Sequence, residues 1–134
     1  MSRQPLGGRD LHYIRNFMGG SGMAYIYMVI CDDSTIYTGI TNDMSKRMKS
    51  HASGSGAGCA KYMRSHKPVS LAALWKTDEY KTAAKLEYAI KKRLCRRQKL
   101  FLAQNPHSVH DFFPHLSEFS FEPIIGAKLE DFLV

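Results

Sequence analysis

The apolar residues in the first half of the chain form short runs that predict strands. Residues 24–31, Ala-Tyr-Ile-Tyr-Met-Val-Ile-Cys, are rich in β-branched and aromatic types and too short for a typical helix, so we expect a buried strand. Asp32-Asp33-Ser34 supplies a turn, and residues 35–40 then predict the returning strand of a hairpin. Residues 69–76 predict a third strand.

Apolar positions that recur every three or four residues predict helices. Asn42 or Asp43 is a suitable N-cap for a helix that ends at Ser53-Gly54. Apolar positions recur in it every four residues, at Met44, Met48 and Ala52. This stripe is expected to pack on the hairpin.

A second, long and basic helix is predicted from about Tyr80, because apolar positions recur there at spacings of three and four. They are Ala83, Leu86, Ile90 and Leu94. Beyond Pro106 the chain becomes acidic and aromatic, and only short helical or irregular pieces are expected. The predicted fold is α+β, a three-stranded, mainly antiparallel sheet flanked by helices.

The length of 134 residues is typical of one domain with one core. We expect a tail over residues 1–22, a main domain over 23–104 and an acidic, aromatic extension over 105–134. No apolar run reaches the roughly 18 residues of a membrane span. The three cysteines are widely spaced, without a CxxC pair, which argues against a disulfide framework or a zinc site and favours a cytoplasmic location.

The net charge of +7 is unevenly distributed along the chain. Residues 61–99 carry twelve Lys and Arg against three Asp and Glu, whereas residues 100–134 carry one against five. Concentrated positive charge favours a polyanionic partner, most often nucleic acid, although a solvated basic helix has the same composition.

Five polar side chains could meet at one site. Tyr27 and Tyr37 lie ten residues apart on paired strands, so both face one side of the sheet only if the turn has an odd number of residues or a bulge intervenes. A three-residue turn over Asp32-Asp33-Ser34 would satisfy this condition. Arg47 and His51 are one helical turn apart and project from one stripe, next to the methionines. Glu87 is expected at the flank of the apolar stripe of the later helix.

These residues, in this order, resemble the GIY-YIG nuclease superfamily. The resemblance covers residues 24–100 and rests on Tyr25-Ile26-Tyr27, Tyr37-Thr38-Gly39, Arg47, His51 and Glu87. The runs around His51, residues 61–64 and residues 86–88 are similar to the small stand-alone bacterial branch, the YhbQ-like and single-strand-specific proteins. Ala24 or Tyr25 replaces the first Gly of the name motif, Thr38 replaces the Ile of the second, and residues 57–59 lengthen a glycine-rich loop.

The resemblance implies a role for each of the five residues in hydrolysing a phosphodiester bond. Glu87 would hold Mg²⁺ or Mn²⁺, and Arg47 would stabilise charge on the phosphate. Tyr27 is favoured over Tyr37 as the general base, with Tyr37 as its hydrogen-bonding partner, and His51 would orient a tyrosine or water or take its proton. Taken singly, each residue has an ordinary alternative: packing tyrosines, a surface arginine, an exposed or capping histidine, and a glutamate paired with Lys91 at i,i+4.

Further residues are candidates for binding the nucleic acid. Lys61, Tyr62 and Arg64 follow the glycine-rich loop, where the tyrosine could stack on a base while the cations meet phosphates. Lys91 and Lys92 of the basic helix are candidates for the same partner. A basic loop with a buried tyrosine is an equally good interpretation of residues 61–64.

The function predicted is a divalent-metal-dependent endonuclease acting on DNA. Single-stranded or branched DNA is the expected substrate, because no separate sequence-reading domain is visible. One alternative is a non-catalytic nucleic-acid-binding module on the same scaffold. A third interpretation makes the basic helix a membrane-surface or partner-binding element.

Overall fold

A computed structural model describes residues 22–54 and 66–134 of the chain. The strands are β1 (Ala24–Cys31), β2 (Ile36–Thr41), β3 (Pro68–Thr77) and β4 (Glu122–Pro123). The α-helices are α2 (Met44–Ser53), α3 (Tyr80–Arg93), α4 (Arg96–Gln104) and α5 (Val109–Phe112). Single turns of 3₁₀ helix are η2 (Pro106–Ser108), η3 (Pro114–Leu116) and η4 (Leu129–Phe132).

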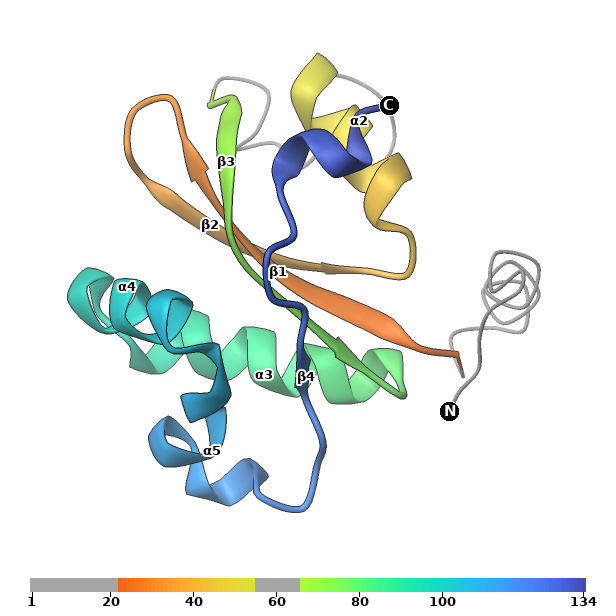
Figure 1. The fold of residues 1–134 in the computed structure, drawn as a ribbon. Coiled ribbons are helices and arrows are strands. Elements are labelled where there is room, and N and C mark those ends of the chain that lie inside the picture. The colour runs from red at the N-terminus through yellow and green to blue at the C-terminus, as the bar shows by residue number, and fades with distance from the viewer. Residues whose placement is uncertain (1–21, 55–65) are drawn as a thin grey trace.

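The strands form one antiparallel sheet in the order β2-β1-β3-β4, with helices on both faces (Figure 1). The predicted α+β class and the three predicted strands are therefore confirmed. The expected strand count of three was wrong by one, because the extension after residue 105 adds β4 along β3. That strand is two residues long and pairs through Trp75 and Lys76, too short to leave a period in the sequence.

Side chains of β1 alternate between two hydrophobic clusters, as the two-residue period of a strand requires. On one face, Ile26 and Met28 pack with the apolar sides of α3, α4 and α5. On the other face, Tyr27 and Val29 pack with α2 and with η4. Because both faces of β1 are covered, the strand is apolar throughout and lacks the alternation of a half-exposed strand.

The predicted long basic helix is interrupted. α3 ends at Arg93, Leu94 and Cys95 are extended, and α4 begins at Arg96. The apolar spacing continues through Leu94 because this residue is itself buried, so the period alone did not reveal the break. Cys95 is the N-cap of α4, and its backbone N–H donates to Oε1 of Gln98 over 2.9 Å.

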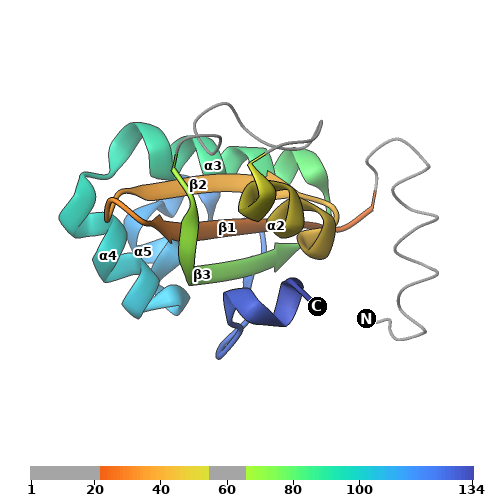
Figure 2. The same cartoon turned by 90° about the horizontal axis from the view of Figure 1, so that it is seen from above.

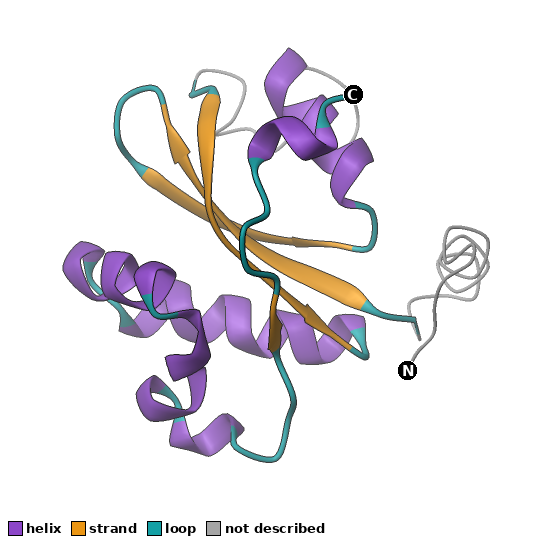
Figure 3. Ribbon diagram, in the orientation of Figure 1, coloured by secondary structure: helices purple, strands orange, loops and turns teal. Residues whose placement is uncertain are grey.

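The segment after α4 wraps around the β3 edge from one face of the sheet to the other (Figure 3). Phe113 and Leu116 are buried with α3 and α4 on the first face. After β4, Leu129 is buried in the cluster that contains Tyr27 and the methionines of α2. The extension thus contributes to the core on both faces.

Among the described residues, no helix combines the length and the apolar character needed to cross a membrane.

Candidate active site

The hairpin places Tyr27 and Tyr37 on the same face of the sheet. Tyr27 is opposite Gly39, and Val29 is opposite Tyr37, which leaves a three-residue loop between Cys31 and Thr35. Ser34 has a left-handed φ of 71°, as expected for the last residue of such a loop. The turn therefore has the three residues that the sequence suggested. The ring centroids of Tyr27 and Tyr37 lie 6.3 Å apart.

Gly39 makes room for the Tyr27 ring. A Cβ atom at position 39 would lie 2.6 Å from Cζ of Tyr27, far inside van der Waals contact. The glycine is therefore required by the ring that lies across it. The sequence analysis quoted Gly39 only as part of a motif, and its signal was its position two residues after Tyr37.

Helix α2 brings His51 to the tyrosines. Its N-cap is Asp43, whose carboxylate accepts from the backbone N–H of Lys46 over 3.1 Å, and Gly54 ends it in the left-handed conformation. Met44 and Met48 are buried against the sheet, as predicted from their spacing. His51 is fully buried at the end of this stripe and is neither exposed nor a cap.

Tyr27 and His51 are joined by a hydrogen bond of 2.8 Å between the phenolic oxygen and Nε2. The His51 ring centroid lies 5.8 Å from the ring centroids of Tyr27 and of Tyr37. Among the described residues, Nδ1 of His51 is buried and has no hydrogen-bond partner. The two phenols and the imidazole therefore form one compact aromatic and polar cluster.

Burial shifts both titrating groups of this pair toward their neutral forms. It raises the pKa of Tyr27, an effect that the charge of the nearby Arg47 partly offsets. Burial and, to a smaller extent, the positive charge of Arg47 together lower the pKa of His51 to about 4. At neutral pH the imidazole is uncharged, so that its Nε2 can accept the phenol's hydrogen while Nδ1 carries the ring proton.

Arg47 lies one helical turn before His51 and is half-buried. Its Nη1 donates to the backbone carbonyl of Ile40 in β2 over 3.0 Å. This bond ties the guanidinium to the outer strand of the sheet. The guanidinium also hydrogen-bonds the side chain of Tyr27, which lowers the pKa of that phenol. Because a guanidinium has five N–H bonds, donors beyond these two contacts are left for an anion.

Glu87 and Lys91 reach the cluster from the opposite face of the sheet. They belong to α3, which runs alongside the outer strand β2 in Figures 1 and 2. Nζ of Lys91 lies 3.2 Å from Oε2 of Glu87 and 5.5 Å from the ring centroid of Tyr37. The negative charge of Glu87 is close enough to raise the pKa of Tyr27. The site therefore straddles the β2 edge.

The residues of the cluster fit a hard divalent cation that takes a single protein ligand, the carboxylate of Glu87. In the described parts of the chain, no group of three or more His, Cys, Asp and Glu residues is arranged to hold a metal. Glu87 contributes one carboxylate, 23% exposed, which already attracts the ammonium of Lys91. Mg²⁺ is commonly bound through one or two carboxylates, with waters and phosphate oxygens as its other ligands.

The structure thus gathers all five candidate catalytic residues around one strand edge. Lys91, which the sequence suggested both as a nucleic-acid contact and as the i,i+4 partner of Glu87, is part of the same cluster and does form that pair. Lys92 is exposed on α3, with Nζ 5.9 Å from the ring centroid of Tyr88. Lys61, Tyr62 and Arg64 lie outside the described residues.

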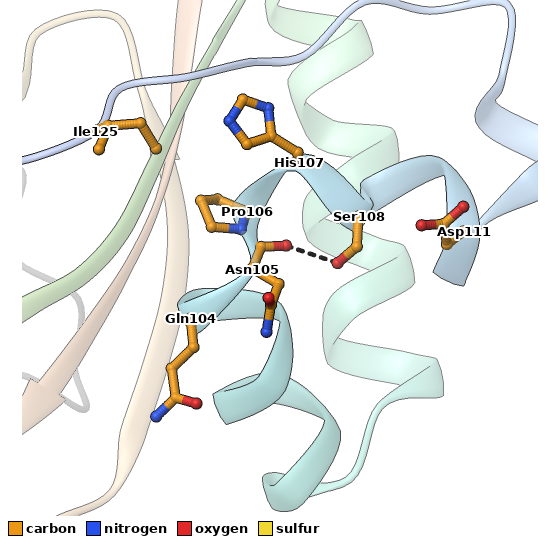
Figure 4. Close-up of a pocket in the computed structure, with 7 residues that line it drawn as sticks. All are labelled: Gln104, Asn105, Pro106, His107, Ser108, Asp111 and Ile125. Carbon is orange, nitrogen blue, oxygen red and sulfur yellow. Dashed lines mark hydrogen bonds between the residues drawn. The ribbon is translucent and has the colours of Figure 1, made fainter.

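A separate hollow of about 510 Å³ lies where α4 and η2 meet the segment after β4 (Figure 4). Its lining includes His107, Asp111 and Ile125, and none of the five candidate catalytic residues. Two of the lining residues bond to each other: Ser108 Oγ donates a hydrogen bond to the Asn105 carbonyl over 2.6 Å. The hollow and the polar cluster are therefore distinct features.

An antiparallel sheet with helices on both faces, and with a polar cluster at its β2 edge, makes this a small α+β domain. A family model described as the GIY-YIG catalytic domain matches residues 23–100. The chain belongs to this family, in its small stand-alone bacterial branch. The match to the family model ends within α4. The extension that crosses the β3 edge therefore lies outside the matched residues.

The relatives that the chain resembles are UPF0213 proteins. It is 37% identical over 89 residues to one from Cupriavidus necator, covering 66% of this chain and 94% of the relative. It is 43% identical over 75 residues to one from Halalkalibacterium halodurans, covering 56% and 76%. With YsiG of Lactococcus lactis the identity is 37% over 92 residues, covering 69% and 86%. No solved structure matches the chain.

Proposed function

We propose that this chain is a divalent-metal-dependent endonuclease that hydrolyses phosphodiester bonds in DNA. The observation that carries the proposal is the convergence of five side chains at one strand edge, from four different elements and both faces of the sheet: Tyr27, Tyr37, Arg47, His51 and Glu87. Hydrolysis needs an activated water and neutralisation of the charge that develops on the phosphate. These side chains supply both.

Tyr27 is the proposed general base. It takes a proton from the attacking water while its own phenolic proton moves along the 2.8 Å hydrogen bond to Nε2 of His51. Water becomes the nucleophile, and the imidazole becomes an imidazolium. Because burial raises the pKa of Tyr27 and lowers that of His51 to about 4, this transfer is unfavourable in the resting protein. Arg47 acts in the opposite sense on the phenol, because its charge favours the phenolate.

Arg47 is proposed to bind the scissile phosphate. Its Nη1 is anchored to the Ile40 carbonyl, so the guanidinium is held in position before the substrate arrives. Charge-assisted hydrogen bonds from the remaining donors would stabilise the extra negative charge of the transition state. Tyr37, whose ring packs edge-on against His51, would keep the imidazole in place.

Glu87 is the proposed ligand for Mg²⁺ or Mn²⁺. When bound, the cation would polarise the phosphoryl oxygen and stabilise the leaving oxygen. Nζ of Lys91 lies 3.2 Å from Oε2 of Glu87, so the lysine and the cation would share the negative charge of this carboxylate.

The proposed substrate is single-stranded or branched DNA, and the proposed location is the cytoplasm. Unpaired strands offer bases that can stack on aromatic side chains. The widely spaced cysteines of the sequence fit a reducing compartment.

A cleavage assay with single-stranded, duplex and flap DNA tests the proposal. Cleavage is expected to depend on added Mg²⁺ or Mn²⁺ and to be abolished in Glu87→Gln. The matched control is Glu79→Gln, which removes a carboxylate at the start of the same helix, where it pairs with Lys81 at 3.8 Å. Wild-type protein that leaves all three substrates intact with either metal would defeat the catalytic claim.

The second candidate is a non-catalytic nucleic-acid-binding module. The observation in its favour is the 3.2 Å ion pair between Glu87 and Lys91, which gives the carboxylate an ordinary structural partner. Under this alternative, DNA binds in a salt-dependent manner but stays intact, and Glu87→Gln binds as well as wild type.

A further inference from the structure

The outward side of α3 carries an unusual combination of side chains. Lys85, Tyr88 and Lys92 follow one another at spacings of three and four, which places them on a single stripe. Tyr88 is 62% exposed and lies in the middle of this stripe. The two lysines are seven residues apart, about 10 Å along the helix axis. We refer to these three residues as the outer stripe.

The charge of the outer stripe is not neutralised by neighbouring carboxylates. α3 contains five basic residues, and Glu87 is its one acidic residue. In the described parts of the chain, the carboxylates near α3 pair with Lys81 and Lys91, and no ion pair involves Lys85 or Lys92. The stripe is therefore a site of positive potential that attracts an anion.

Tyr88 presents an aromatic ring between the two cations. Nζ of Lys92 lies 5.9 Å from its ring centroid, while Nζ of Lys85 lies 5.7 Å from the ring centroid of Phe119. No aromatic ring among the described residues stacks on Tyr88, whereas the exposed Phe101 packs edge-on against Phe112 with 5.9 Å between ring centroids. The face of the Tyr88 ring that Lys92 does not cover is thus open to a flat partner from solvent.

The outer stripe adjoins the candidate active site. Each residue of a helix is turned by about 100° from the one before, so Lys91 lies between Glu87 and Tyr88 around the axis of α3. The opposite side of the helix, including Leu86 and Ile90, is buried in the core. A helix that inserts into a membrane surface needs that apolar side free, so a lipid partner does not fit.

We infer that the outer stripe binds an unpaired stretch of DNA next to the active site. Tyr88 stacks on one exposed base, and Lys85 and Lys92 contact phosphates on either side. This inference rests on the proposed function for its ligand and adds to it the feature that selects single strands. Stacking needs a base that is not already paired and covered, so duplex DNA cannot use Tyr88 in this way.

Binding measurements without divalent metal test the inference separately from cleavage. Fluorescence anisotropy with labelled single-stranded and duplex oligonucleotides in EDTA gives both affinities. Tyr88→Ala is expected to weaken single-strand binding at least about fivefold and to leave duplex binding unchanged. Tyr88→Phe should bind as wild type, because the ring is kept. Phe101→Ala, at another exposed aromatic residue, is the control and should leave both affinities unchanged.

Salt dependence tests the lysines. Lys92→Gln should reduce the slope of log affinity against log salt for single strands by about 0.7, the value for one phosphate contact. Lys128→Gln, at an exposed lysine outside α3, should leave the slope unchanged.

Three outcomes overturn the inference: folded Tyr88→Ala binding single strands as wild type, equal losses on duplex and single strands, or binding to anionic lipid vesicles without binding to oligonucleotides. Thermal melting establishes that each variant is folded. If wild type cleaves DNA but Tyr88→Ala binds normally, the inference fails and the proposed function stands. If binding depends on Tyr88 but no DNA is cut, the inference stands and the proposed function fails.

Discussion

The phenolic oxygen of Tyr27 and Nε2 of His51 lie 2.8 Å apart, in a hydrogen bond that joins the central strand β1 to helix α2. Both side chains are fully buried. The bond therefore fixes the relative position of β1 and α2, which together carry three of the five candidate catalytic residues. It also gives the phenol a neutral acceptor for its proton.

Replacing Tyr27 by Phe keeps the buried ring and removes the phenolic oxygen. We expect cleavage to be lost while metal-free DNA binding is retained, because the general base is removed and the surface is not. His51 loses its partner, so the free energy of unfolding should fall by about 1–3 kcal/mol. Cleavage at the wild-type rate by folded Tyr27→Phe would rule out Tyr27 as the base.

The buried His51 predicts a loss of stability in acid. Its pKa is lowered to about 4 in the folded protein, against about 6.5 in the unfolded chain. Below pH 6.5 the unfolded chain binds a proton that the folded protein does not, so stability present above pH 6.5 declines as the pH falls toward 4. The free energy of unfolding, measured with urea, should be lower at pH 4.5 than at pH 7.5. His51 should account for at most about 3 kcal/mol of this difference. His51→Gln should show a smaller drop, and equal drops would contradict the assignment.

Gly39→Ala should displace the Tyr27 ring, because the new Cβ would lie 2.6 Å from Cζ. We expect a loss of about 1–3 kcal/mol in unfolding free energy together with reduced cleavage. Gly126→Ala is the comparison: that glycine has a φ of 84° and open space around it. This second change should cost about 1 kcal/mol through backbone strain and leave cleavage per folded molecule unaltered.

Lys91→Gln should strengthen metal binding at Glu87, because it removes the cation that competes for the carboxylate. An exposed ion pair is worth up to about 1 kcal/mol, which corresponds to a gain of about fivefold in affinity for Mn²⁺. Isothermal titration calorimetry measures this without reference to activity. Weaker Mn²⁺ binding by Lys91→Gln would show that the lysine supports the metal site. Mn²⁺ binding that survives in Glu87→Gln would show that Glu87 is not the metal ligand.

Leu129→Ala tests whether the extension supports the site. Leu129 is 6% exposed and shares a cluster with Tyr27 and Met48, so the truncation should destabilise the protein by about 2–5 kcal/mol. Leu133→Ala, nearby and 38% exposed, should change the unfolding free energy by less than about 0.5 kcal/mol. Similar chemical denaturation midpoints for the two variants would mean that the packing of η4 does not contribute to the stability of the protein.

The hairpin and α2 were predictable because local chemistry determines them. The apolar run of β1, the three-residue turn and the caps at Asp43 and Gly54 each specify a local conformation within a few residues. The predicted bounds of β1 are those observed, and β2 and β3 differ from their predictions by one residue at each end. The ordered motif then identified the residues that meet at the β2 edge.

What the sequence did not reveal depends on contacts between distant segments. The burial of His51 follows from the sheet that α2 covers, and its bond to Tyr27 spans 24 residues. β4 exists because the extension passes along β3, where Ile124 donates its N–H to the Leu74 carbonyl over 2.8 Å. The position of Lys91 beside Tyr37 requires the packing of α3 along the outer strand, which no period in the helix itself encodes.

The return of the chain to the Tyr27 face has a consequence for how the protein folds during synthesis. All five candidate catalytic residues precede Leu129 in the chain, yet the hydrophobic cluster beneath Tyr27 and α2 is incomplete until Leu129 has been added. A nascent chain stopped at the family boundary, residue 100, would hold the chemical groups without the packing that orients them. If the proposed function holds, cleavage activity should therefore require synthesis through Leu129.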